Sequence, residues 1–132
     1  MSKILVADDS RFQVALLSEA LQQKGFEVVT AQDAVQAGMV ALRSAPDAII
    51  LDINMPGGSG IEVLKRLRNS TKTRGIPVVV VSGSGDSAVR QLAMELGVTH
   101  FLAKPVNLEE LCGTLSDLLS GPGLLKSSTK AQ

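Results

Sequence analysis

The sequence predicts an α/β fold, in which helices cover both faces of a doubly wound parallel sheet of five strands. Three observations favour it. Five short apolar runs alternate with five segments whose apolar residues recur at helical spacing. The connections are too short for anything but crossovers between parallel strands. Residues 49–51 and 78–81 are uninterrupted apolar runs, typical of strands that are buried on both faces.

The first strand, residues 3–7, is a short apolar run that stops at Asp8. Ser10 and Gln13 then have the spacing of a capping box, and apolar residues recur at helical spacing until Gly25 closes the segment. The first strand is therefore expected to lead into a helix. The recurring apolar residues of this helix are Phe12, Ala15, Leu16, Leu17, Ala20 and Leu21.

The second strand is predicted over residues 26–30, where apolar and β-branched residues predominate. Asp33 is the expected start of a helix of small residues that continues to about Ser44, and Pro46 ends it. Gly38, inside this helix, indicates close packing on the sheet.

The central strand, residues 47–52, ends in the carboxylate of Asp52. A glycine-rich turn over residues 56–60 follows, and a third helix is marked by the apolar spacing of residues 61–67. The basic residues on its outward face, which we expect only to be solvated, are Lys65, Arg66 and Arg68.

The fourth strand, residues 78–81, is a run of valines that stops at Ser82. Residues 83–85 are expected to form a flexible loop, Asp86 is the expected N-cap of the fourth helix, and Gly97 is expected to end that helix.

The fifth strand, residues 98–103, ends at Lys104. Asn107 and Glu110 have capping-box spacing at the start of the last helix, which residues 121–123, a Gly-Pro-Gly sequence, are expected to break.

The composition indicates one globular domain. The chain has 132 residues, and we expect the domain to cover residues 1–120 and residues 121–132 to be a flexible tail or the start of a linker. Its 13 basic and 13 acidic side chains balance, which argues against nucleic-acid binding. No membrane-length apolar run or leader is visible, so a cytoplasmic location is expected. The absence of Trp and Tyr disfavours stacking of bases, flavins or sugars.

Polar side chains follow four of the five predicted strands, at the edge where open α/β sheets bind ligands. Three carboxylates gathered there repel one another, and a divalent cation such as Mg²⁺ would relieve the repulsion. A lysine and a hydroxyl suit the oxygens of a phosphoryl group, and a carboxylate can act as its acceptor. The residues concerned are Asp8, Asp9, Asp52, Ser82 and Lys104.

These strand ends, together with the Leu-Asp-Ile-Asn-Met-Pro sequence at residues 51–56, resemble the response-regulator receiver domain of two-component signalling over roughly residues 3–120. The resemblance implies a flavodoxin-like fold with strand order 2-1-3-4-5. It also implies a phosphorylation-dependent switch, in which Asp52 accepts a phosphoryl group from a histidine kinase or a histidine phosphotransfer protein. Such a domain is not an enzyme with a separate substrate.

The same resemblance implies a ligand set for Mg²⁺. Asp9, Asp52 and the backbone carbonyl of Asn54 would bind the ion directly, and Asp8 would act through water. Lys104 and Ser82 would contact the phosphoryl oxygens.

The resemblance further implies a switch residue and an output surface. Phe101 matches the switch aromatic, which would move together with Ser82, and Lys104-Pro105 matches a peptide bond that is usually cis in the family. The surface formed by the fourth helix, fifth strand and fifth helix would then change shape and be read by a downstream protein.

Other classes of protein fit the sequence less well. A receiver-like docking module that is never phosphorylated would be expected to have lost a site residue, and none is missing. A small Mg²⁺-dependent phosphohydrolase usually needs an acid two residues after its nucleophile, where this chain has Asn54. A flavin-binding electron carrier would need a hydroxyl- and glycine-rich phosphate loop after the first strand and aromatic side chains beside the ring. A transcription factor would need a second, basic domain.

Overall fold

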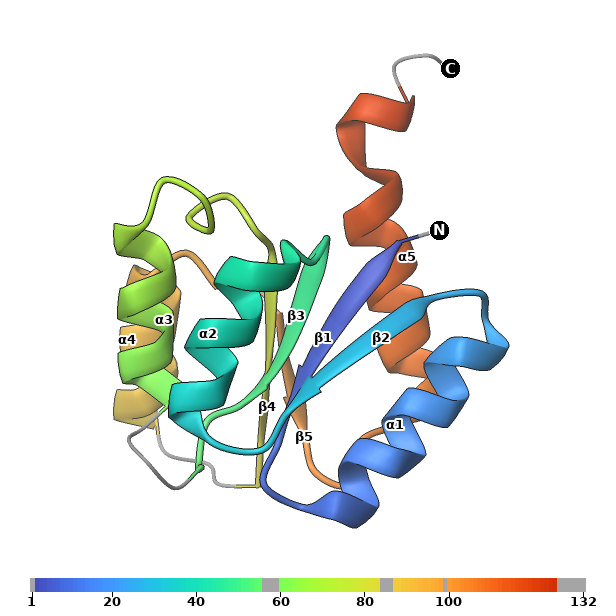
Figure 1. Cartoon of the computed structure of the whole chain (residues 1–132), viewed down its shortest axis with the longest axis horizontal. Helices are drawn as coiled ribbons and strands as arrows, with labels where there is room; N and C mark the ends of the chain where they lie inside the picture. Colours follow the sequence, from blue (N-terminus) through green and yellow to red (C-terminus); the bar gives the residue numbers. More distant parts are fainter. Residues whose placement is uncertain (1, 56–59, 84–86, 99, 126–132) are drawn as a thin grey trace.

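The computed structural model describes residues 2–55, 60–83, 87–98 and 100–125, and it confirms the predicted parallel α/β fold (Figure 1). The strands are β1 (Lys3–Ala7), β2 (Glu27–Ala31), β3 (Ala48–Asp52), β4 (Val78–Ser82) and β5 (His100–Ala103). The helices are α1 (Arg11–Gln23), α2 (Ala34–Ser44), α3 (Gly60–Asn69), α4 (Ser87–Glu95) and α5 (Leu108–Leu125). Residues 56–59 of the turn predicted over 56–60, the Asp86 N-cap and residues 126–132 of the tail predicted over 121–132 lie outside the described residues.

The five strands are parallel and lie in the order β2-β1-β3-β4-β5, as expected. The register brings their carboxyl ends to one edge: Ala7 lies beside Leu51, and Ser82 lies beside Ala103. The residues that follow these strand ends therefore meet at the same edge, which positions the candidate site.

The helices form a layer on each face of the sheet. In Figure 1, α1 and α5 lie on one side, and α2, α3 and α4 lie on the other. Successive residues of β1 alternate between the two layers: Leu5 packs with residues of α2 and α3, and Val6 packs with residues of α1 and α5. Every residue of β3 is buried, which agrees with its uninterrupted apolar sequence.

The start of α1 is capped as predicted, because the Ser10 hydroxyl accepts a hydrogen bond from the Gln13 amide at 3.2 Å. The apolar repeat predicted for this helix only partly matches its buried face. Leu17 and Leu21 are buried, but Phe12 is 76% exposed, and the remaining buried residue of this helix is Val14, which the predicted repeat did not include. Residues three or four apart share a helix face, and Phe12 lies five residues before Leu17.

Three predicted strand starts, those of β2, β3 and β5, were one to two residues too early. Two of these strands, β2 and β5, follow a helix that ends in a Schellman motif. The amide of Phe26 donates to the Leu21 carbonyl, and the amide of Val98 donates to the Ala93 carbonyl. These residues satisfy helix carbonyls instead of pairing in the sheet, so β2 begins at Glu27 and β5 begins at His100.

The prediction that residues 121–123 break the last helix was wrong, because α5 continues to Leu125. Proline removes one backbone donor, but its fixed φ lies within the helical range, so a single proline does not by itself end a helix. In Figure 1 the last turns of α5 project beyond the sheet. On the same helix, Cys112 is buried, as expected.

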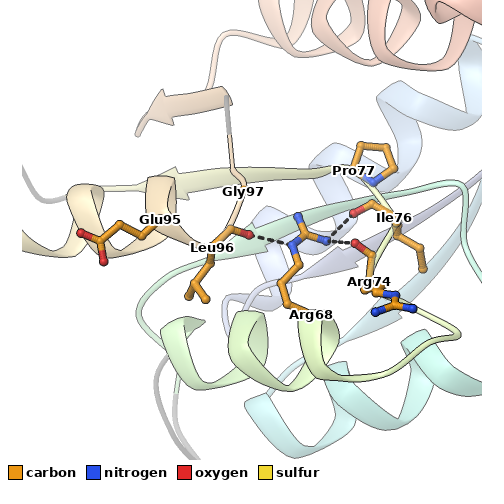
Figure 2. A pocket seen from close by; sticks show the side chains of 8 residues that line it. Arg68, Arg74, Ile76, Pro77, Glu95, Leu96 and Gly97 are labelled. Carbon is orange, nitrogen blue, oxygen red and sulfur yellow. Dashed lines mark hydrogen bonds between the residues drawn. The ribbon is translucent and has the colours of Figure 1, made fainter.

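Two expectations about α2 and α3 were also wrong. A Cβ atom at Gly38 would lie 3.4 Å from Nη1 of Arg66, so this glycine allows close packing against α3 and not against the sheet. Arg68 is not simply solvated, because its guanidinium donates three hydrogen bonds to backbone carbonyls (Figure 2). Within the described ranges, no helix is long and apolar enough to span a membrane.

Figure 2 shows Arg68 in an open pocket near the amino ends of β4 and β5, at the edge of the sheet opposite the candidate site. Its Nε atom donates to the carbonyl of Leu96 at 2.7 Å, and its Nη1 atom donates to the carbonyls of Arg74 at 3.0 Å and Ile76 at 2.9 Å. Arg68 thus joins the end of α3 to the residue that follows α4.

Candidate functional site

Three aspartates meet at the carboxyl edge of the sheet, as the sequence predicted. Asp8 and Asp9 follow β1, and Asp52 is the last residue of β3. Each offers a carboxylate oxygen, and these oxygens lie within 4.8 Å of one another. Asp8 and Asp52 are each only 3% exposed, whereas Asp9 is exposed. The cluster is therefore buried on one side and accessible from the other.

Lys104 lies between the two buried carboxylates. Its Nζ atom is 3.1 Å from Oδ2 of Asp52 and 3.3 Å from Oδ2 of Asp8. The Lys104 amide donates to the carbonyl of Ser82 at 3.0 Å, which fixes the residue to the end of β4. One ammonium group thus faces two buried negative charges.

The second oxygen of each buried carboxylate accepts a hydrogen bond from the backbone two residues later. The amide of Ser10 donates to Oδ1 of Asp8 at 2.9 Å, and the amide of Asn54 donates to Oδ1 of Asp52 at 3.1 Å. Aspartate commonly forms such local turns. Because both oxygens of each carboxylate are held, the side chains are fixed in orientation before any ligand binds.

The electrostatics of the site favour an added cation. Burial raises the pKa of Asp52 above its ordinary value of 3.8, and the nearby charge of Asp8 adds to this, although the hydrogen bonds from Asn54 and Lys104 act in the opposite direction. For Lys104, burial alone would lower the pKa, but the hydrogen bond and charge of Asp52 and the charge of Asp8 outweigh it, so the net shift is upward.

The donor set fits a hard divalent cation. Carboxylate oxygens with an open side are the ligands that Mg²⁺ prefers, and the ion keeps several waters of its own. A cation beside Asp8, Asp9 and Asp52 would offset the negative charge of these carboxylates that the single ammonium group of Lys104 does not neutralise. The chemistry of the residues is thus compatible with the expected magnesium site.

Two further residues named from the sequence, Ser82 and Phe101, lie on the strands β4 and β5. Ser82 ends β4 and is partly buried, and Phe101 lies on β5, where it is also partly buried. Both line a cavity of about 380 Å³ between α4 and the sheet. The peptide bond between Lys104 and Pro105 is cis, as expected.

One contact near the site was not predicted. Arg90, on α4, places its guanidinium carbon 4.7 Å from the centre of the Phe101 ring. In the sequence, Arg90 is simply a basic residue on the exposed side of a helix, and no local pattern connects it to a residue on β5.

A doubly wound sheet whose carboxyl edge brings together three aspartates and a lysine is typical of a regulatory phosphoacceptor domain. Residues 4–116 match the family model described as the response regulator receiver domain. The chain therefore belongs to the response-regulator receiver-domain family of two-component signalling.

Similar proteins agree with this membership. The transcriptional regulatory protein CpxR of Escherichia coli (strain K12) is 39% identical over 119 residues, which are 90% of this chain and 50% of CpxR. The response regulator PleD of Caulobacter vibrioides is 39% identical over 106 residues, 80% of this chain and 23% of PleD. The chain thus spans about half or less of the length of these curated relatives.

Among solved structures, the chemotaxis response regulator CheY4 of Vibrio cholerae is similar to this chain, with a TM-score of 0.83 and 34% identity. The match covers 90% of this chain and 99% of CheY4.

Proposed function

We propose that this receiver domain is a phosphorylation switch in which Asp52 accepts a phosphoryl group from a phosphohistidine. The donor would be a histidine kinase or a histidine phosphotransfer protein in the cytoplasm. One observation carries the proposal: the Asp52 carboxylate lies at the carboxyl edge of the sheet, 3.1 Å from the Lys104 ammonium and within 4.8 Å of two further carboxylates.

Mg²⁺ would be held directly by Asp9, Asp52 and the backbone carbonyl of Asn54, and through water by Asp8. When bound, the ion supplies positive charge that offsets the carboxylates and the phosphoryl oxygens. The hard oxygen donors of this cluster and its shortage of positive charge support this assignment.

In the transfer itself, a carboxylate oxygen of Asp52 forms a bond to phosphorus, and the bond between phosphorus and the donor's imidazole nitrogen breaks. The electron pair of the broken bond stays with the imidazole. Lys104 then pairs with a phosphoryl oxygen through its ammonium group, whose pKa the charges of Asp52 and Asp8 already raise in the unphosphorylated protein. The Ser82 hydroxyl donates to another phosphoryl oxygen.

The phosphoryl group would draw Ser82 inward, and the Phe101 ring would move into the cavity that both residues line. The surface formed by α4, β5 and α5 then changes shape and is read by a downstream protein. The cavity of about 380 Å³ that lies beside the ring offers space for this movement.

A second surface suits the phosphodonor. Phe12 is 76% exposed and Leu16 is 40% exposed, and both lie on α1, which starts directly after Asp9 and Ser10. Large apolar side chains are normally buried, so their exposure beside the carboxylates suits a protein partner that brings its histidine to Asp52.

The test is the intact mass of the protein after incubation with acetyl phosphate and Mg²⁺. We expect one adduct of about 80 Da that requires Mg²⁺ and is lost in Asp52→Asn, because phosphorylation adds one group at one side chain. Asp117→Asn removes an exposed carboxylate of α5 and serves as the matched control, which should be modified like the wild type.

The alternatives give different results. A docking module that is never phosphorylated would show no adduct. This result counts only if circular dichroism shows an intact fold and if rapid dephosphorylation of the protein has been excluded. A phosphohydrolase would release many equivalents of phosphate from small phosphate esters. Asn54, two residues after Asp52, disfavours this second alternative.

A further inference from the structure

We propose that Arg90 is a positioning residue of the switch, whose guanidinium holds Phe101 in the position seen in this structure and so opposes the response to phosphorylation. This inference rests on the proposed function of Asp52. It adds to that function a residue on α4 that sets how readily the domain changes state.

The contact itself is a cation–π interaction. The guanidinium carbon of Arg90 lies 4.7 Å from the centre of the Phe101 ring, within the distance of about 6 Å at which such contacts are effective. Phe101 is partly buried and packs against the core between the sheet and α2, α3 and α4, whereas Arg90 is exposed. The arginine therefore covers the ring from the solvent side.

The cavity beside the ring explains why this contact would matter. Ser82, Arg90 and Phe101 all line it, so the phosphoryl-contacting residue, the arginine and the switch aromatic surround one space. The remaining walls are mostly apolar, and they include Ile53 and Val80. A phenyl ring can enter such a space without leaving a polar group unsatisfied.

The guanidinium cannot follow the ring into the cavity. Moving a charged group from water into apolar surroundings without a partner is costly, and arginine keeps its charged end in water while its stem packs on apolar surface. Inward movement of Phe101 therefore separates it from Arg90, and the contact favours the position in which the ring now lies.

The helix that carries Arg90 is held at its other end. Arg68 donates a hydrogen bond of 2.7 Å to the carbonyl of Leu96, directly after the last residue of α4. Arg90 is thus presented to Phe101 from a helix whose carboxyl end a hydrogen bond joins to α3.

The test uses beryllium fluoride, which with Mg²⁺ mimics a phosphoryl group on a carboxylate. We expect Arg90→Met to lower the apparent dissociation constant for beryllium fluoride about two- to fivefold, which is the change in equilibrium constant that corresponds to the free energy of one exposed cation–π contact. A mere loss of positive charge would weaken binding of this anion, so the direction separates the two effects. Arg43→Met, an exposed arginine of α2, is the matched control for charge and should not bind more tightly.

A double-mutant cycle links the effect to the ring. In a Phe101→Leu background the π face is absent, and Arg90→Met should then give no tightening. Nuclear magnetic resonance reports the ring directly, because the chain has only three Phe residues and no Trp or Tyr. In the unmodified protein, Arg90→Met should shift the Phe101 ring signals, and Arg43→Met should not.

The outcomes are distinct. Equal or weaker binding in Arg90→Met, or the same tightening in the Phe101→Leu background, overturns the role of Arg90 while the proposed function of Asp52 stands. If the wild type binds no beryllium fluoride and takes no phosphate from acetyl phosphate, the proposed function itself fails, and the role of Arg90 fails with it.

Discussion

Gly60→Ala should damage both the stability of the fold and the candidate metal site. Gly60 is the first residue of α3, and its amide donates to the carbonyl of Ile53 at 2.9 Å. Ile53 lies between Asp52, the proposed phosphoacceptor, and Asn54, whose carbonyl is a proposed metal ligand. A change at Gly60 is therefore transmitted directly to the site.

The size of the effect follows from the distances. A Cβ atom at Gly60 would lie 2.6 Å from Cα of Ile53, whereas ordinary van der Waals contact begins at 3.4 Å, so the two backbones must separate by about 0.8 Å. Overpacking of this kind costs about 1–3 kcal/mol of unfolding free energy. Mg²⁺ demands near-ideal geometry, and displaced supporting groups typically weaken metal binding about tenfold or more.

The assay is urea unfolding followed by circular dichroism, because the chain has no Trp or Tyr for fluorescence. Mg²⁺ affinity is measured on the same samples by calorimetry. Gly113→Ala is the matched control: Gly113 lies in α5, and no atom lies within 4 Å of the added Cβ. We expect this control to gain about 0.5–1 kcal/mol from helix propensity and to bind Mg²⁺ normally.

Two results would refute the reasoning. If Gly60→Ala is as stable as the wild type, then α3 does not approach Ile53 as closely as the structure has it. If the variant is destabilised but binds Mg²⁺ with wild-type affinity, then Ile53 does not couple the start of α3 to the metal ligands.

Three further predictions concern single side chains. Arg68→Met should lose about 1–3 kcal/mol of unfolding free energy in urea, because the backbone carbonyls that accept hydrogen bonds from its guanidinium would lose their partner. The control variant Lys65→Met should stay within about 0.5 kcal/mol of the wild type. Equal stability of the two variants would contradict this prediction. Because the pKa of Asp52 is raised in the folded state, between pH 3.8 and that raised pKa this carboxyl binds more protons in the folded protein than in the unfolded chain, and its contribution to stability should fall as the pH rises through that window. In the metal-free Asp52→Asn variant, thermal unfolding should lack this part of the pH dependence and occur at higher temperature at neutral pH; an unchanged pH profile would count against it. Phe12→Ala should slow phosphotransfer from a phosphohistidine donor about tenfold or more but leave phosphorylation by acetyl phosphate unchanged, because only the protein donor touches α1; equal losses with both donors would exclude a docking role.

Local signals explain what could be predicted from the sequence. The valine run of β4 and the apolar run of β3 identify buried strands on composition alone, and Ser10 marks the start of α1 through a hydrogen bond to a residue three positions later. Because all strands are parallel, the residues at their carboxyl ends must meet at one edge. The grouping of Asp8, Asp52 and Lys104 was therefore predictable without a structure.

Helix ends and buried faces were less predictable. Gly25 and Gly97, which end α1 and α4, allow Schellman motifs. In these motifs the amide of the next residue donates to a helix carbonyl, so the following strand begins later in the sequence than predicted. The sequence contains apolar residues on more than one side of α1, and only the packing of that helix on the sheet decided that Val14 is buried and Phe12 is exposed.

By itself, the sequence determined the order of strands and helices, the edge that carries the carboxylates and the class of chemistry that they suit, because these depend on short-range spacing and on the direction of the strands. Only the tertiary structure decided that Arg68 holds Leu96, 28 residues away, and that Arg90 covers Phe101. Such contacts join residues of different helices and strands, and the two arginines have the sequence pattern of exposed residues. The contacts form only because of the way α3, α4 and β5 pack together, and no local sequence pattern predicts this packing.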